Sequence, residues 1–475
     1  MWANLESYEK GMGNKALIGF NLKHLLAVTN GRNPFDDIDL SLLDIKPVII
    51  KDIPSFDRLM KKLAKTDLIC TDVEGRSLAT ITNTMFTIQI GFWENDRVQS
   101  YVIPWKHRDH TWSSTEFKHI RKHLRRLFLR EDLENVFHFG QFDIGQLCVE
   151  LNLDIFLNKV YDIPAAEFAI DENHKYLQKL YRSAGEWDDG YKAYSLEFVE
   201  HRYGIFRPSD MVIGKADRAN MSKFSLHEIA QYGGFDIVSP LIIREAQLSQ
   251  CTQKYIGHKS KEDFLMLLHH QLGIMIKTFA LLKNTGIHID QKNARSLVAD
   301  GNIFTQTAKE IRKQILETKP GQKTNNLLLK QQGITTSTGM FSSQKAEVFS
   351  LSKPSHLRKL FFDVMKFEPT KIGKSGEPSA DKTFQSKYKA DPVVKMYGNY
   401  NKVKILKSTF ADGLIKIIDN SDDFKSDGRL RPILGFLFVL TGRLSSTDPN
   451  CVTGNTEVLT KRGYVKITDV TTDDF

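Results

Sequence analysis

The chain has 475 residues, a formal net charge of +9, 41% hydrophobic residues and 26% charged residues. This composition is typical of globular proteins and excludes a mainly disordered or collagen-like chain, and at about 100–200 residues per domain the length indicates several domains. The apolar run at 433–440 is far shorter than a membrane span of about 18 residues, so we expect no membrane partner. The four cysteines form no Cys-x-x-Cys pair, which favours a reducing compartment. We expect a cytoplasmic location and suspect a bacterial or phage-infected cell, although no sequence pattern specifies the source.

Residues 1–50 contain no pattern that assigns them a role. From residue 51 on, runs of β-branched and aromatic residues, which are typical of strands, alternate with segments whose apolar residues have helical spacing. The sequence predicts strands at 67–71, 84–93, 97–105 and 135–139, and helices at 115–130 and 142–151. This order predicts a mixed α/β sheet.

Helical patterns dominate the middle of the chain. Ser225 and Glu228 form a capping box that opens a helix over 226–250, and Asp290 can cap a later helix. The remaining predictions are helices over 261–317 broken at 283–290, loops around one short helix at 319–347, a helix over 391–418 and small strands over 451–475.

Acidic residues follow the predicted strands. Asp72 and Glu74 lie at the end of the predicted strand that begins at residue 67, and Asp143 lies just past the strand at 135–139. Tyr232 and Asp236 are four residues apart, so they project from one face of the helix over 226–250. Four carboxylates that meet at a sheet edge would repel one another unless cations neutralise them, and Mg²⁺ prefers such oxygen ligands.

An Asp-x-Glu pair, then Asp, then Tyr-x-x-x-Asp, in this order, resembles the tyrosine subtype of the DEDD 3′→5′ exonucleases. The resemblance implies a ribonuclease-H-like sheet and two divalent cations, Mg²⁺ or Mn²⁺. Its metal ligands would be Asp72, Glu74, Asp143 and Asp236, and Tyr232 would orient the attacking water. Where the family often has Asn, four residues before the middle Asp, this chain has Phe139.

Later segments resemble family A DNA polymerases. The segments at 281–290, 341–351, 359–386 and 400–414 resemble the thumb, and TGRLSSTDPN at 441–450 resembles the entry into the palm. The resemblance implies that Arg443 contacts the primer-end minor groove and that Asn450 contacts duplex DNA. Ala380 and Asn401 depart from the family pattern. The metal-binding aspartates of the palm and the fingers helix are absent from the sequence, so we expect no polymerase site in this chain alone.

The tail CVTGNTEVLTKRGYVKITDVTTDDF at 451–475 resembles the first block of an intein of the Hint fold. In this interpretation the Cys451 thiol attacks the carbonyl of Asn450 and forms a thioester. The rest of an intein would lie on a separate chain that also carries the palm and fingers. A naturally split intein and a truncated gene both remain open.

The predicted fold class is therefore multidomain α/β plus α, and the domain prediction follows the resemblances. It comprises a segment of unknown role at 1–50, an exonuclease domain at 51–260, a thumb and beginning of palm at 261–450, and an intein fragment at 451–475. The predicted function is the N-terminal part of a replicative polymerase with a proofreading exonuclease that acts on single-stranded 3′ ends and primer–template DNA. Two alternatives stay open: a stand-alone DEDD exonuclease and a non-catalytic DNA-binding subunit.

Overall fold

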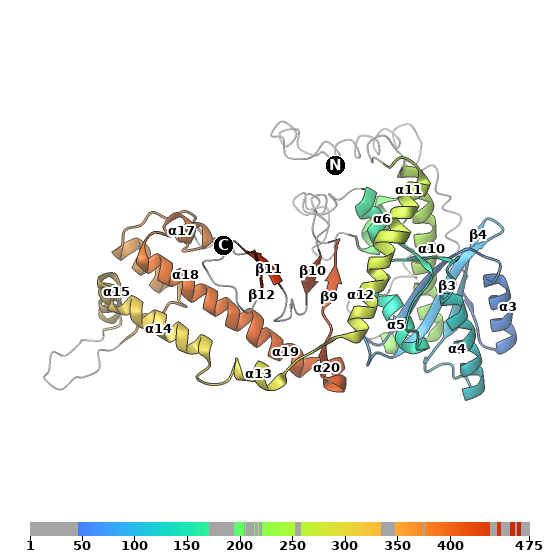
Figure 1. Ribbon diagram of the computed structural model, residues 1–475, viewed down its shortest axis with the longest axis horizontal. Coiled ribbons are helices and arrows are strands. Elements are labelled where there is room, and N and C mark those ends of the chain that lie inside the picture. Colours follow the sequence, from blue (N-terminus) through green and yellow to red (C-terminus); the bar gives the residue numbers. More distant parts are fainter. Residues whose placement is uncertain are drawn as a thin grey trace. The chain divides into compact units, whose positions relative to one another are not determined.

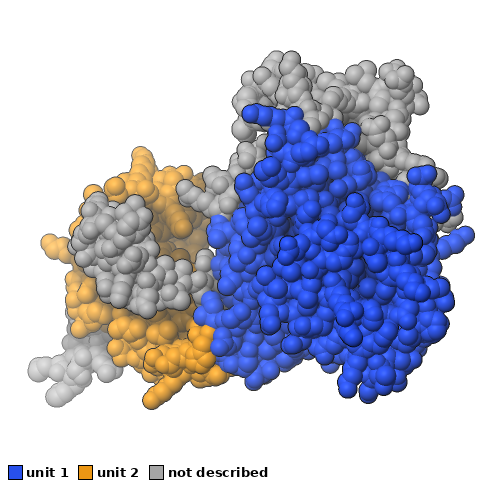
Figure 2. All heavy atoms as spheres, turned by 45° about the vertical axis from the view of Figure 1, so that its right-hand side comes forward, with its two compact units in different colours: residues 1–287, 422–475 blue, residues 288–421 orange. Residues whose placement is uncertain are grey.

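The computed structural model describes most of the chain between residue 46 and residue 466. The described residues are 46–170, 194–203, 205, 213, 217, 221–251, 258–333, 347–373, 376–437, 444–447, 457–460 and 463–466. They divide into two compact units, residues 1–287 with 422–475 and residues 288–421, coloured blue and orange in Figure 2. The domain boundaries predicted at residues 50, 260 and 450 stay predictions.

A six-stranded sheet in the order β1-β4-β3-β2-β5-β6 forms the centre of the first unit (Figure 1). Strands β2, β3 and β4 pair antiparallel, whereas the β1–β4, β2–β5 and β5–β6 pairs are parallel. The strands are β1 (Val48–Ile49), β2 (Leu68–Gly75), β3 (Met85–Glu94), β4 (Arg97–Pro104), β5 (Glu134–Phe137) and β6 (Lys159–Asp162). The predicted mixed sheet is confirmed, and β2 extends beyond the predicted strand.

Helices cover this sheet and continue its core. They are α3 (Ile53–Leu63), α4 (Ser114–Phe128), α5 (Gln141–Leu151), α6 (Ile163–Ile170), α8 (Leu196–Arg202), η3 (Met221–Lys223), α10 (Leu226–Gln250), α11 (Lys261–Leu267), η4 (Leu268–Leu272), α12 (Gly273–Thr285) and α20 (Asp422–Asp427). Helix α10 packs along β2, β3 and β4, and α12 packs on α5 and β6. The predicted capping box is present, because Ser225 Oγ accepts from the Glu228 backbone N–H while the Glu228 carboxylate accepts from Ser225 N.

The helical stretch Lys261–Thr285, which comprises α11, η4 and α12, bears on the expectation of no membrane partner. Within the described part of the chain it is one helix long and apolar enough to cross a membrane by length and composition. A single such helix is weak evidence, and Phe264, Ile276 and Phe279 on its inner side belong to the core of the first unit. The absence of a membrane partner therefore stays a prediction.

The second unit is helical. Its helices are α13 (Gln291–Ser296), α14 (Ile303–Glu317), α15 (Lys319–Gln331), α16 (Pro354–Arg358), η5 (Lys359–Val364), α17 (Lys382–Lys387), α18 (Pro392–Ile405), η6 (Leu406–Ala411) and α19 (Asp412–Asn420). Their core includes Ile315, Leu328, Phe361 and Phe384. Asp290 caps α13 as predicted, since its Oδ1 accepts from Asn293 N at 3.1 Å.

Two predictions for this unit need correction. A second break separates α13 from α14, because Gly301 has a φ of +70° and Asn302 caps the next helix. The stretch predicted as loops around one short helix holds the thirteen-residue helix α15. Polar residues cover its outer face, but its buried Leu328 and Leu329 stabilise it against the core.

Short two-stranded pairings complete the described structure. The remaining strands are β7 (Ile287–His288), β8 (Arg429–Leu430), β9 (Ile433–Gly435), β10 (Ser445–Thr447), β11 (Glu457–Thr460) and β12 (Gly463–Lys466). Strands β11 and β12 are antiparallel, with Val458 opposite Val465. Small strands were predicted in this tail. Arg443, Asn450 and Cys451 lie outside the described residues, as does nearly all of the predicted segment 1–50.

Candidate metal centre

Strand β2 carries two of the predicted ligands. Asp72 lies opposite Gln89 of β3 and Glu74 lies opposite Thr87, so the two carboxylates lie in the paired second half of β2. Because side chains alternate along a strand, residues two apart project from the same face. Both are partly exposed. The pairing with β3 therefore holds two carboxylates side by side.

Helix α10 brings a third carboxylate to the same place. Ligand oxygens of Asp72, Glu74 and Asp236 all lie within 4.8 Å of one another. Tyr232 lies one turn before Asp236 and is 8% exposed. Its side chain packs in a small cluster that includes Phe86 and Ile229. The structure thus brings together three of the four predicted metal ligands.

Two glycines allow α10 to approach the sheet closely. A Cβ atom on Gly91 of β3 would lie 1.9 Å from Ile237 Cγ2, and one on Gly233 of α10 would lie 2.5 Å from Gln89 Nε2. A side chain at Gly91 would press against Ile237 of α10, and one at Gly233 would displace the Gln89 amide. These glycines were not predicted as site residues, although Gly233 and Gly234 stand directly between Tyr232 and Asp236 in the sequence.

Asp143, the fourth predicted ligand, lies beside this group on α5. It is 4% exposed, and its Oδ1 accepts a hydrogen bond from Val73 N of β2 at 3.1 Å. The pKa of Asp143 is raised to about 8, mainly by burial and in part by the negative charges of Asp162 and Asp236, against hydrogen bonds that lower it. The metal-free site therefore holds a protonated carboxyl at neutral pH.

Asp162, at the end of β6, is a neighbour that the sequence patterns did not identify. Its Oδ2 accepts from Gly140 N at 2.8 Å and its Oδ1 accepts from Ala165 N at 3.1 Å, while burial raises its pKa to about 6. It thereby holds the turn before α5, in which Phe139 has a φ of +60°. Asn is enriched at such left-handed positions. Phe139 in place of the family's Asn therefore changes a residue that suits the backbone conformation and leaves the metal ligands unchanged. The sequence pattern that could have identified Asp162 is an acidic residue two positions before Pro164, which marks the start of a helix.

The donor set fits a hard divalent cation. The three converging side chains offer only carboxylate oxygens, which Mg²⁺ and Mn²⁺ prefer over nitrogen or sulfur. Cys70 on the same strand is buried, and burial together with Asp72, Asp143 and Asp236 raises the pKa of its thiol well above the usual range. The thiol is therefore neutral and is a poor ligand.

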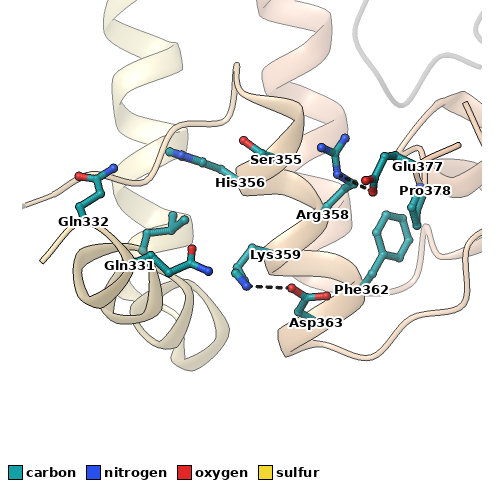
Figure 3. A pocket seen from close by; sticks show the side chains of 11 residues that line it. Gln331, Gln332, Ser355, His356, Arg358, Lys359, Phe362, Asp363, Glu377 and Pro378 are labelled. Carbon is teal, nitrogen blue, oxygen red and sulfur yellow. Dashed lines mark ion pairs between the residues drawn. The ribbon is translucent and has the colours of Figure 1, made fainter. Parts of the chain in front are cut away.

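The second unit contains a pocket of different chemistry (Figure 3). It encloses about 420 Å³ and is lined mainly by α15, α16 and η5. Its two cations face carboxylates, with Arg358 Nε 3.4 Å from Glu377 Oε2 and Lys359 Nζ 3.1 Å from Asp363 Oδ2. Because both charges are already balanced, this pocket is a weaker candidate than the carboxylate cluster.

Comparisons with known proteins agree with the exonuclease and the polymerase resemblance. Residues 47–185 match the family described as 3'-5' exonuclease, and residues 322–456 match DNA polymerase family A. The segment 47–185, which includes Asp72, Glu74 and Asp143, is therefore similar to 3′-5′ exonucleases, and the segment 322–456 is similar to part of a family A polymerase domain. Tyr232 and Asp236 lie outside both matched segments.

A solved structure has a similar fold. The POL domain of Pol1 from M. smegmatis, in complex with DNA primer-template and dNTP, matches with a TM-score of 0.52 and 16% sequence identity. The match covers 85% of this chain and 55% of that chain, so this chain spans about half the length of that structure. At such low identity the similarity concerns the fold alone. No curated protein matches this chain.

Proposed function

We propose that this chain is the N-terminal part of a DNA-replicating family A polymerase and that it carries a 3′→5′ proofreading exonuclease. One observation carries the exonuclease proposal: Asp72, Glu74 and Asp236 converge within 4.8 Å beside buried Asp143, on and next to a segment of the exonuclease family. The match of residues 322–456 to family A polymerases favours a polymerase over a stand-alone nuclease.

The residues of the cluster have distinct roles in this proposal. Asp72, Glu74, Asp143 and Asp236 would hold two divalent cations, Mg²⁺ or Mn²⁺. Such ions, when bound, supply activation of a water molecule and stabilisation of the leaving oxygen of a phosphodiester. Asp143 would release its proton on becoming a ligand, since its pKa is raised to about 8 in the metal-free chain. Tyr232 would orient the attacking water through its hydroxyl, one turn from Asp236.

The test uses the full chain with a labelled single-stranded oligodeoxynucleotide and Mg²⁺ or Mn²⁺. Asp72→Ala combined with Glu74→Ala should abolish 3′→5′ degradation while the fold is retained, because removing ligands relieves carboxylate repulsion. Tyr232→Phe should lower the rate while metal binding survives. Glu131→Ala combined with Asp132→Ala removes two exposed carboxylates before β5 and serves as the matched control. Undiminished activity in the first double variant would refute the assignment.

The polymerase part of the proposal concerns DNA binding without synthesis. Arg443 and Asn450 would contact primer–template DNA, and the chain alone would not incorporate nucleotides. Binding measured by fluorescence anisotropy should weaken as salt rises, because phosphate contacts release counterions. Primer extension by the purified chain would contradict this proposal.

The tail at 451–475 would act as the N-terminal fragment of a split intein. The antiparallel pair β11–β12 supports this, since an intein of the Hint fold is β-rich. Cys451 would form a thioester with Asn450, and a partner chain would supply the rest of the intein and the missing palm and fingers. Mixing with that partner should yield a ligated product that lacks 451–475, and Cys451→Ala should block it. Equal ligation by both proteins would refute the split intein and favour a truncated gene.

A cytoplasmic location in a bacterial or phage-infected cell also stays a proposal. The cysteines among the described residues, Cys70, Cys148 and Cys251, are free and buried, as expected in a reducing compartment. Fractionation of the source cells would test it.

A further inference from the structure

The loop at 76–84 connects the strand that carries Asp72 and Glu74 to β3. Two side chains from other parts of the first unit hold it. The first is Gln146 of α5, which is 2% exposed. Its Nε2 donates to Ala79 O and Thr80 O at 3.0 Å each, and its Oε1 accepts from Asn83 Nδ2 at 3.0 Å. Gln146 lies one turn after Asp143, so the loop is tied to the helix of the fourth candidate ligand.

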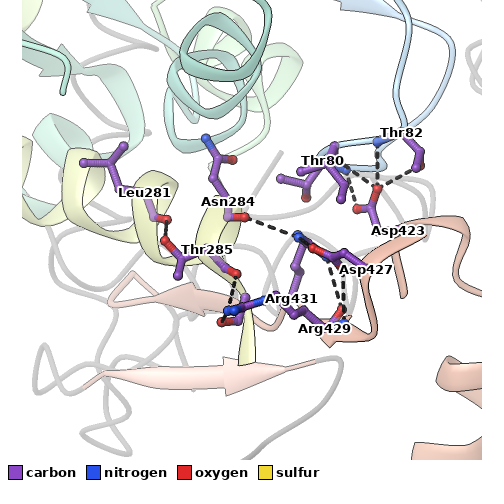
Figure 4. Close-up of polar contacts among 11 residues, drawn as sticks. Thr80, Thr82, Leu281, Asn284, Thr285, Asp423, Asp427, Arg429 and Arg431 are labelled. Atoms are coloured by element: carbon purple, nitrogen blue, oxygen red, sulfur yellow. Dashed lines mark hydrogen bonds and ion pairs between the residues drawn. The ribbon is translucent and has the colours of Figure 1, made fainter. Parts of the chain in front are cut away.

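The second side chain is Asp423 of α20 (Figure 4). Its Oδ2 accepts from Thr80 N at 2.6 Å, and its Oδ1 accepts from Ile81 N at 3.0 Å, from Thr82 N at 2.9 Å and from Thr82 Oγ1 at 2.8 Å. The residue is 6% exposed. A buried carboxylate that accepts four hydrogen bonds from three consecutive residues fixes both their backbone and its own position.

Helix α20 has an anchorage of its own, independent of the loop. Arg431 pairs with Asp427 of this helix and donates from Nη2 to Asn284 O at 3.4 Å. Arg429 donates from Nη1 to Thr285 O at 3.2 Å, at the carboxyl end of α12. These arginines satisfy helix-end carbonyls that α12 itself leaves without partners. Because α20 is fixed in this way, Asp423 holds the loop from an anchored position.

We propose that Asp423 is a positioning residue for the exonuclease centre. Asp423 holds the loop at 76–84, so that Asp72, Glu74 and Asp143 keep the arrangement that binds metal. Thr80 to Thr82 lie in the exonuclease-family segment and Asp423 lies in the polymerase-family segment. In this proposal, a residue of the segment similar to polymerases holds the loop next to the exonuclease site, and both lie within the first unit. This inference rests on the proposed exonuclease function.

The experiment compares Asp423→Ala and Asp423→Asn with Asp422→Asn in the full chain. Asp422 is the matched control, since its side chain is 81% exposed and lies 3.9 Å from Lys425. Three quantities are measured: amide hydrogen exchange of residues 79–83, the Mn²⁺ concentration for half-maximal binding by calorimetry, and kcat and KM for a single-stranded oligodeoxynucleotide.

Asp423→Ala should raise amide exchange at Thr80 to Thr82 at least about tenfold, because the backbone donors lose their acceptor. It should also raise the half-saturating Mn²⁺ concentration and lower kcat by about tenfold, with little change in KM. Asp423→Asn should lie between, since an amide oxygen still accepts hydrogen bonds. Asp422→Asn should match the wild-type chain in all three.

Unchanged amide exchange in Asp423→Ala would overturn the proposal, because the loop would then be held without Asp423. Faster exchange with unchanged Mn²⁺ binding would overturn it as well, because the loop would not position the ligands. A wild-type chain without exonuclease activity would refute the proposed function instead, and Mn²⁺ binding would then decide the positioning role.

Discussion

Replacing Asp143 by Asn should stabilise the first unit when no metal is present. The side chain is buried, and its Oδ1 accepts from Val73 N at 3.1 Å. An asparagine amide oxygen is an equally placed acceptor, so this hydrogen bond survives the change. The change removes only the ionisable group whose pKa burial raises to about 8.

The magnitude follows from the pKa of Asp143 in the folded and unfolded chain. A carboxyl with a pKa of 3.8 when unfolded and about 8 when folded binds more protons in the folded state between these pH values. The contribution of Asp143 to the free energy of unfolding of the metal-free chain therefore falls as pH rises from about 4 to about 8. At pH 7 about three pH units of this window have passed, and each is worth about 1.4 kcal/mol. Because relaxation and water entry reduce the loss, we expect a gain of about 2–4 kcal/mol in Asp143→Asn.

Urea unfolding in the presence of a chelator measures this gain. Trp93, Trp105 and Trp112 lie in the first unit, and the sequence of residues 288–421 contains no tryptophan, so a tryptophan fluorescence change reports the first unit. The stability difference between variant and wild type should be small at pH 4.5 and should grow up to about pH 8. Asp162, with a pKa of about 6, titrates in both proteins and should largely cancel in the difference.

The metal state supplies the control for this prediction. Saturating Mn²⁺ should stabilise the wild-type chain more than Asp143→Asn, because only the wild type keeps the full ligand set. A variant that is no more stable than the wild type at pH 8 in chelator would refute the reasoning, and so would a difference that does not change with pH.

Three further predictions concern packing, the buried ion pairs and proton release. Gly91→Ala should destabilise the first unit by about 1–3 kcal/mol and reduce exonuclease activity, because its Cβ would displace α10 at Ile237; Gly413→Ala, with no atom within 4 Å of the new Cβ, is the unfolding control. Glu134→Gln should cost about 3–5 kcal/mol in urea unfolding, because it removes the buried carboxylate that pairs with Arg244 and His269 and leaves Arg244 only the exposed carboxylate of Glu245. A loss below about 1 kcal/mol would contradict this. Calorimetry in buffers of different ionisation enthalpy should show that Mn²⁺ binding at pH 7 releases protons from the Asp143 carboxyl. A binding enthalpy that is the same in all buffers would refute this prediction.

Local interactions explain what the sequence predicted about this chain. The capping box of Ser225 and Glu228 and the cap at Asp290 are hydrogen bonds between residues three apart, so residue type and spacing suffice to predict them. Runs of β-branched and aromatic residues likewise indicated β3 and β4, and helical spacing of apolar residues indicated α4, because residue type and spacing are local features of the sequence. The chain order of the carboxylates and Tyr232 was enough to propose an exonuclease.

Tertiary structure alone decided the surroundings of those carboxylates. Strand β2 extends through Asp72 and Glu74 because β3 pairs with it there. The hydrogen bonds of Asp162 to Gly140 and of Asp423 to Thr80 join residues 22 and 343 positions apart, and no local pattern specifies such partners. The raised pKa of Asp143 likewise arises from burial among residues that are distant in the chain. Residues near one another in the sequence are enough to predict helices, strands and caps. The charge state and position of a buried carboxyl depend instead on which distant segments pack around it.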